Sequence, residues 1–254
     1  MSRDAGKLLI TAIWLALAGC GQDAAPAPER TTSAVPSPPN ASPAPSDIPE
    51  SQPSEIASSA APAALPGKSY APRDDCSAAP GWPAFRQSLA AAVRDKDADA
   101  IAALAAPDIT LDYGGGSGTD ELKKRLADPE RQLWRELSGI LPLGCAVEGG
   151  LAAMPWVFWN VPDNIDSYSA MLVTGDDADL LDSPKGQPQG NVGWFIVGID
   201  PLAFKPGAKL TRVTLDNGEK GWVETARLRS LLDYRLIAEP KDGSWKITAF
   251  IAGD

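Results

Sequence analysis

The chain changes composition abruptly near Cys76, and this change limits how much of it can fold. Residues 21–75 contain 12 of the 24 prolines, many alanines and serines, and a single aromatic residue, Tyr70. Such a segment buries too little apolar surface to offset the entropy lost on ordering, so we expect it to be a disordered tether. Seven of the eight tryptophans lie C-terminal to it. The part that folds is therefore expected to span about 180 residues, enough for one substantial core or two small ones.

The first twenty residues have the pattern of a targeting segment. Arg3 and Lys7 are followed by an apolar run over residues 8–18. This run is too short to span a bilayer comfortably, because a transmembrane helix needs about 20 apolar residues. It is typical of the central region of a signal peptide, which we place at residues 1–19.

The tetrapeptide Leu17-Ala18-Gly19-Cys20 resembles the lipobox of bacterial lipoproteins. This resemblance implies that Cys20 becomes the first mature residue, carries acyl chains and begins a tether over 20–75. Since Gly21 follows the cysteine where an Asp would typically signal inner-membrane retention, the resemblance implies the periplasmic face of the outer membrane. The alternative is an ordinary cleaved signal peptide in which Cys20 is incidental.

The composition excludes several classes of chemistry. Without histidine there is no Ser-His-Asp or Cys-His nucleophile and no His-ligated zinc or haem. A formal charge of −10 and a pI near 4.6 argue against nucleic acid as a partner, since that needs a basic face. The acidic residues within 176–182 lack the glycine and distal glutamate of an EF-hand, and the glycine run at 114–118 lacks the lysine of a phosphate loop. We therefore expect no metal, no cofactor and no catalytic residue.

The two remaining cysteines, Cys76 and Cys145, are expected to form a disulfide. In the oxidising compartment that the leader implies, two thiols most simply pair. The bridge closes a loop of about 70 residues and contributes on the order of 4 kcal/mol in the chain-entropy model. A reactive thiol is the alternative, but Cys145 has no basic or histidine neighbour in sequence to lower its pKa.

The periodicity of apolar residues divides the folded part in two. Residues 76–153 are predicted to be mainly helical, because apolar positions such as Phe85, Leu89 and Val93 recur at helical spacing. From residue 154 to 254 the pattern alternates, as in half-buried strands. Strands are expected over 156–160, 168–173, 178–182, 192–198, 210–216, 220–225, 231–239 and 244–252. Asp216-Asn217-Gly218 predicts a tight hairpin turn.

The run 213–223, which ends in Gly221-Trp222-Val223, resembles the last hairpin of bacterial SH3-like (SH3b) domains. The segment 178–184 matches the position of the first strand of that family. The segment 201–209 is an insertion that is unusual for it. The resemblance implies a small SH3-like β-barrel at about 167–230. The expected fold is thus α+β, with N-terminal helices, this barrel and C-terminal closing strands.

A weaker resemblance covers the segments on either side of the barrel. The paired helices, the glycine-rich turn and the terminal run 242–250 are similar to NTF2-like cone folds. This resemblance implies that the barrel is inserted between the helices and the closing strands.

Two functions follow as hypotheses. The SH3b resemblance implies a noncatalytic module that binds cell-wall peptide (peptidoglycan) or an envelope protein, and we select Trp194, Phe195 and Trp222 as ligand-binding residues because binding sites are enriched in aromatic side chains. Core filling is the competing explanation for such aromatics. The alternative function is an NTF2-like small-molecule carrier or a histidine-free carboxylate enzyme, for which Asp108, Asp112 and Glu121 form the nearest carboxylate set.

Overall fold

The computed structural model describes residues 63–253. The predicted signal peptide at 1–19, the predicted acylation of Cys20 and tether residues 20–62 lie outside the described residues and stay predictions. Among the helices of the described part, none combines the length and the apolar character that crossing a bilayer requires.

Within residues 63–253, the α-helices all come from the first half. They are α1 (Trp82–Asp95), α2 (Ala98–Leu104), α3 (Thr119–Ala127) and α4 (Leu133–Ile140), followed by the 3-10 turn η1 (Leu141–Leu143). Helix α2 begins after Asp97, whose carboxylate accepts a hydrogen bond from the backbone N–H of Ala100 at 2.9 Å. This contact is a helix cap, as expected for an aspartate at that position.

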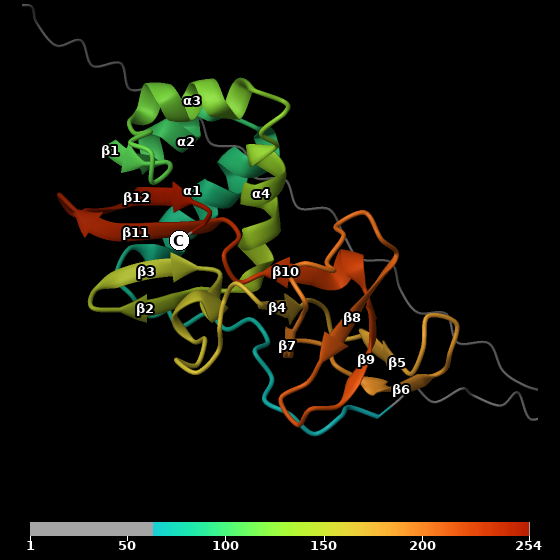
Figure 1. Cartoon of the computed structure of the whole chain (residues 1–254). Helices are drawn as coiled ribbons and strands as arrows, with labels where there is room; N and C mark the ends of the chain where they lie inside the picture. The colour runs from blue at the N-terminus through green and yellow to red at the C-terminus, as the bar shows by residue number, and fades with distance from the viewer. Residues whose placement is uncertain (1–62, 254) are drawn as a thin grey trace, which may run out of the picture. The chain divides into compact units, whose positions relative to one another are not determined.

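A five-stranded sheet packs with these helices (Figure 1). Its strands are β1 (Ala105–Thr110), β2 (Ala146–Glu148), β3 (Leu151–Met154), β11 (Arg235–Lys241) and β12 (Ser244–Ile251), in the order β1-β12-β11-β3-β2. Strand β1 runs parallel to β12, and the other pairs are antiparallel. The helices and the sheet share one core, whose largest fully buried members include Trp82, Leu89, Ile101, Leu137, Leu236 and Ile247.

A seven-stranded sheet is formed by the chain between β3 and β11. Its strands are β4 (Ala170–Val173), β5 (Asp179–Leu181), β6 (Pro188–Asn191), β7 (Ile196–Gly198), β8 (Leu210–Thr214), β9 (Lys220–Glu224) and β10 (Leu228–Ser230), in the order β10-β4-β7-β8-β9-β5-β6. The 3-10 turns η2 (Trp156–Trp159) and η3 (Thr225–Arg227) precede β4 and β10. Its separate core includes Val173, Leu180, Val197, Val213 and Val223. In the sequence, this second sheet is inserted between β3 and the closing strands β11 and β12.

The expected SH3-like barrel at about 167–230 is wrong, because neither sheet of the described chain closes on itself. Strands β10 and β6 form the two edges of the seven-stranded sheet and do not pair with each other. The backbone of β6 instead bonds to the chain's own earlier segment: Leu65 N–H donates to Asn191 O, and Asn191 N–H donates to Ala63 O, both at 3.0 Å. The edge of β6 that would have to pair with β10 to close the sheet therefore bonds to residues 63–65 instead. The fold class is therefore α+β with two open sheets.

The segment 63–75 contacts the fold, although it belongs to the region for which the composition predicts a tether. Tyr70 is buried and donates its backbone N–H to Trp194 O at 2.7 Å. Leu65 packs against the core of the seven-stranded sheet. The few apolar side chains of this proline-rich segment thus have partners in the described structure, ahead of the boundary expected at Cys76.

Cys76 and Cys145 are joined by a disulfide, with their Cα atoms 5.7 Å apart. Backbone hydrogen bonds flank it: Cys145 N–H donates to Arg73 O at 2.7 Å, and Asp75 N–H donates to Cys145 O at 2.9 Å. The bridge ties the start of the helical part to the residue that precedes β2.

Two local expectations differ from the structure. The aromatic run at 156–160 forms the 3-10 turn η2 rather than a strand, with Pro155 immediately before it. Residues 146–153, which the periodicity assigns to the mainly helical part, form β2 and most of β3, and these two strands pair with each other. Strand β3 also pairs with β11, more than 80 positions later in the sequence.

Candidate binding groove

The β8–β9 hairpin has one buried face and one exposed face. Val213 on β8 and Val223 on β9 point into the core of the seven-stranded sheet. Because side chains alternate along a strand, the residues between them point the other way. In the strand register Arg212 lies opposite Trp222, and Thr214 lies opposite Lys220, so these side chains share the outer face.

Local turn chemistry sets this register. Asn217 accepts a hydrogen bond from the N–H of Glu219 on its side-chain oxygen at 2.9 Å. Gly218 has φ +84°, a conformation that favours glycine, and its N–H donates to Leu215 O at 3.0 Å. The hairpin turn expected from Asp216-Asn217-Gly218 is therefore present.

The loop between β7 and β8 forms the second wall. Asp200 organises its start, because its carbonyl accepts hydrogen bonds from Ala203 N–H at 3.1 Å and Phe204 N–H at 2.9 Å. A second turn follows, in which Ala208 N–H donates to Lys205 O at 2.9 Å. Phe204 and Lys205 from this loop, with the outer face of the hairpin, enclose a groove of about 530 Å³. This volume lies within the usual range for ligand pockets.

The groove is cationic in an acidic chain. Lys205, Arg212 and Lys220 line it and are exposed, whereas Asp200 is the only acidic residue that lines it. Within residues 63–253, none of the three cations forms an ion pair. The half-buried ring of Trp222 lies beside them. The arrangement can hold carboxylates on its cations and an apolar group on its aromatic side chains.

The structure does not bring the three predicted aromatic ligand residues together. Trp222 lines the groove. Phe195 is buried in the core of the seven-stranded sheet, with its ring against Gly67. Trp194 lies just before β7, at φ +62°, and its indole Nε1 donates to the carboxylate of Asp176 at 2.6 Å. Of the three, only Trp222 belongs to this site.

Sequence reasoning missed Lys205, Arg212 and Lys220. A usable signal existed for the last two, because strict alternation over 210–224 places them on the same face as Trp222. The sequence marks the loop that brings Lys205 to the groove only as an unusual insertion, without indicating a binding role.

The carboxylate set proposed for an enzyme is occupied in ion pairs. Arg125 is nearly buried and contacts Asp112 at 2.5 Å and Glu121 at 2.8 Å. Hydrogen bonds from Gly116 N–H and Arg125 lower the pKa of Asp112, and the hydrogen bond from Arg125 lowers the pKa of Glu121. Asp108 is exposed and lies 4.0 Å from Lys241. Carboxylates whose pKa values are lowered do not serve as general acids at neutral pH.

The acidic residues of the described chain form no cluster that could bind a metal ion. Residues 63–253 contain no group of three or more histidine, cysteine, aspartate or glutamate side chains placed to hold a metal ion. Acidic residues near 176–182 instead make other contacts, such as the ion pair of Asp177 with Arg227 at 3.0 Å.

Several solved structures overlap weakly with the chain. An NTF2-like protein with a cystatin-like fold from Novosphingobium aromaticivorans is 11% identical, with 67% of this chain and 79% of that chain covered at a TM-score of 0.26. A protein of unknown function with a cystatin-like fold from Nostoc punctiforme is 8% identical, with 68% and 86% covered at a TM-score of 0.26. These neighbours are of the kind that the flanking segments resemble, but TM-scores this low carry no inference about activity or ligand. No protein-family model matches the chain, and no curated protein matches it.

Proposed function

We propose that the chain is a noncatalytic binding module whose groove between the 200–209 loop and the β8–β9 hairpin holds a carboxylate-bearing peptide. The observation that carries the proposal is the set of cations around Trp222 that form no ion pair within residues 63–253, in a chain of formal charge −10. Such a local positive charge attracts acidic ligands, whereas the net negative charge of the chain repels them elsewhere.

The chemistry of the groove lining favours a peptide. Arg212 and Trp222 are cross-strand neighbours, so a carboxylate on Arg212 and an apolar group on the indole ring are held side by side. Lys220 adds a second cation on the outer face of the hairpin, and Lys205 lines the groove from the loop. Cell-wall stem peptides combine several carboxylates with small apolar side chains, and this is the ligand class we assign.

The predicted leader supports this assignment. A lipid anchor at Cys20 on the periplasmic face of the outer membrane holds the groove in the compartment of the cell wall. A fully extended proline-rich segment over residues 20–62 reaches on the order of 130 Å. That reach is long enough to present the groove away from the membrane surface.

The direct test is co-sedimentation of the full-length chain with purified cell-wall sacculi. We expect binding that weakens as salt increases, because exposed charges are screened. The double variant Arg212→Gln/Lys220→Gln should bind about 5- to 30-fold more weakly, given about 0.5–1 kcal/mol for each exposed charge contact.

Lys185→Gln is the matched control. Lys185 is exposed, lies outside the groove lining and forms no ion pair within residues 63–253, so its loss should leave binding unchanged. Absence of co-sedimentation above that of an unrelated acidic protein would refute the proposal. A loss of binding free energy in the control about half as large as in the double variant would show that binding follows total charge rather than this groove. Titration with isolated stem peptide separates direct peptide binding from capture of a protein attached to the sacculus.

A further inference from the structure

A second feature, independent of the groove, is the buried cation Arg235 at the start of β11. Arg235 is only 5% exposed. The guanidinium carbon lies 4.9 Å from the centroid of the Phe158 ring, and Nη2 donates a hydrogen bond to the hydroxyl of Tyr113. Its Nε is buried and has no hydrogen-bond acceptor among residues 63–253. Arg235 also forms no ion pair with a carboxylate in that range.

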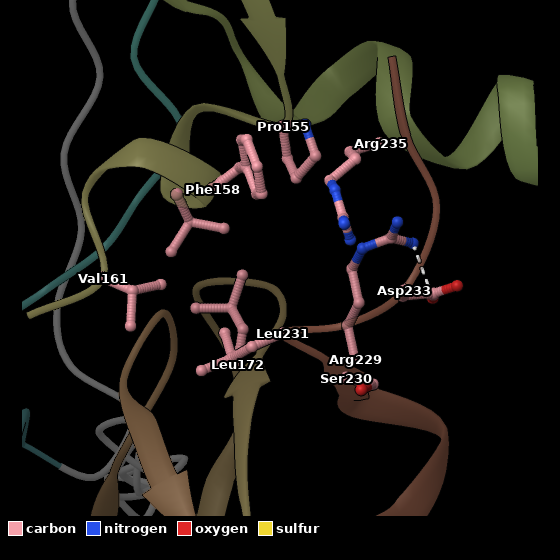
Figure 2. Close-up of a pocket in the computed structure, with 10 residues that line it drawn as sticks. Pro155, Phe158, Val161, Leu172, Arg229, Ser230, Leu231, Asp233 and Arg235 are labelled. Atoms are coloured by element: carbon pink, nitrogen blue, oxygen red, sulfur yellow. Dashed lines mark ion pairs between the residues drawn. The ribbon is translucent and has the colours of Figure 1, made fainter. Parts of the chain in front are cut away.

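Arg235 borders a small cavity, which Figure 2 shows together with its lining. The cavity volume is about 10 Å³, and one side is apolar, formed in part by Phe158, Val161 and Leu172. The polar groups on the other side are Arg229, Ser230, Asp233 and Arg235.

The one carboxylate at this cavity is already paired. Asp233 contacts Arg229 at 3.1 Å, and Arg229 also donates to the carbonyl of Tyr234 at 2.7 Å. The charges of Arg229 and Asp233 therefore offset each other. The positive charge of Arg235 has no such counter-ion in the described structure.

An uncompensated guanidinium is costly in this position. Arginine does not lose its proton at any ordinary pH, so it cannot become neutral in response to burial. A buried charge without a partner is strongly destabilising. A water molecule can accept the free N–H but cannot neutralise the charge, whereas an anion does both.

The size of the cavity limits the anion. A volume of about 10 Å³ accommodates about one water-sized occupant, which excludes sulfate, phosphate and an organic carboxylate. Among the common physiological anions, chloride comes nearest to that size. We propose that this cavity is a binding site for a single monatomic anion, chloride in the cell, held by Arg235 where β10 and β11 are joined.

The test is thermal unfolding of the full-length chain in sodium chloride, sodium bromide and sodium gluconate at equal ionic strength. At a halide concentration tenfold above Kd, we expect Tm to rise by about 3–6 °C relative to gluconate. The shift should disappear in Arg235→Gln and persist in Arg94→Gln, which removes an exposed arginine paired with Asp95. Equal Tm values in the three salts, or a halide shift unchanged in Arg235→Gln, would overturn the proposal.

A direct measurement covers the case in which Arg235→Gln does not fold. Crystals of the unmodified chain grown in bromide should show an anomalous-scattering peak within hydrogen-bond distance of Arg235 Nε. Density without anomalous signal at that position would identify the occupant as water and would refute an anion site.

Discussion

Replacing Gly221 with alanine should destabilise the hairpin that carries the groove. Gly221 is buried on β9, on the face opposite Trp222. A Cβ atom added there would lie 2.6 Å from Cδ1 of Leu180 and 2.8 Å from the carbonyl oxygen of Leu181. Leu180 is fully buried, and the Leu181 carbonyl belongs to the neighbouring strand β5, so neither can move away without shifting the sheet.

The expected cost follows from this crowding. Inserting one carbon into a packed core costs about 1–3 kcal/mol. For a domain of this size each kcal/mol lowers Tm by about 2–4 °C, so Gly221→Ala should lower Tm by about 2–12 °C. Because Lys220 and Trp222 are its neighbours on β9, the same substitution should weaken peptide binding.

Gly139→Ala is the matched control. Gly139 lies in α4, is exposed, and an added Cβ would have no heavy atom within 4 Å. The same chemical change should there stabilise the chain by about 0.5–1 kcal/mol, because alanine is the better helix former. Both variants are compared with the parent by circular dichroism melting. A Gly221→Ala chain that melts at or above the parent would refute the packing argument.

Two further predictions concern stability. Reducing the Cys76–Cys145 disulfide should lower the free energy of unfolding by about 4 kcal/mol, measured by urea titration with and without reductant; an unchanged midpoint would mean that the bridge constrains little. The pKa values of Asp112 and Glu121 are lowered in the folded state, so their contribution is complete above roughly pH 5 and is lost as pH falls through the folded pKa values. Arg125→Met should flatten this acid dependence in urea titrations between pH 7 and pH 3, and an identical pH profile in the variant would contradict the assigned pairing.

What the sequence predicts well is local. The cap at Asp97 and the turn at Asn217-Gly218 depend on a few neighbouring atoms, and both appear where expected. The apolar stripe containing Phe85 and Leu89 likewise forms the buried face of α1. Such features need no knowledge of distant segments.

What the sequence does not predict is how strands choose their neighbours. Strand β6 pairs with β5 but meets residues 63–65 on its other side, and nothing in the local pattern of either segment indicates that contact. The Gly-Trp-Val run correctly identifies a hairpin, yet a hairpin is compatible with an open sheet as well as a barrel. A local resemblance therefore predicts the hairpin but does not predict whether the sheet closes into a barrel.

The candidate groove shows the same division. The sequence predicts Trp222 as a ligand-binding residue, because binding sites are enriched in aromatic side chains. Phe195 has the same sequence signal but belongs to the core, where its ring also lies against Gly67, far away in the sequence. Lys205 reaches the groove only through the turns of the 200–209 loop, whose composition has no periodic pattern.

The contact of residues 63–65 with β6 also determines how a pulling force enters the fold. A pull on the chain from its N-terminal side reaches the hydrogen bonds between Leu65, Ala63 and Asn191 before anything else in the described structure. Further along the chain, the disulfide transmits the pulling force from Cys76 to Cys145, the residue before β2. Helices α1 to α4 lie between the two cysteines in sequence and are bypassed. Residues 63–65 can therefore detach from the seven-stranded sheet before the force reaches the disulfide.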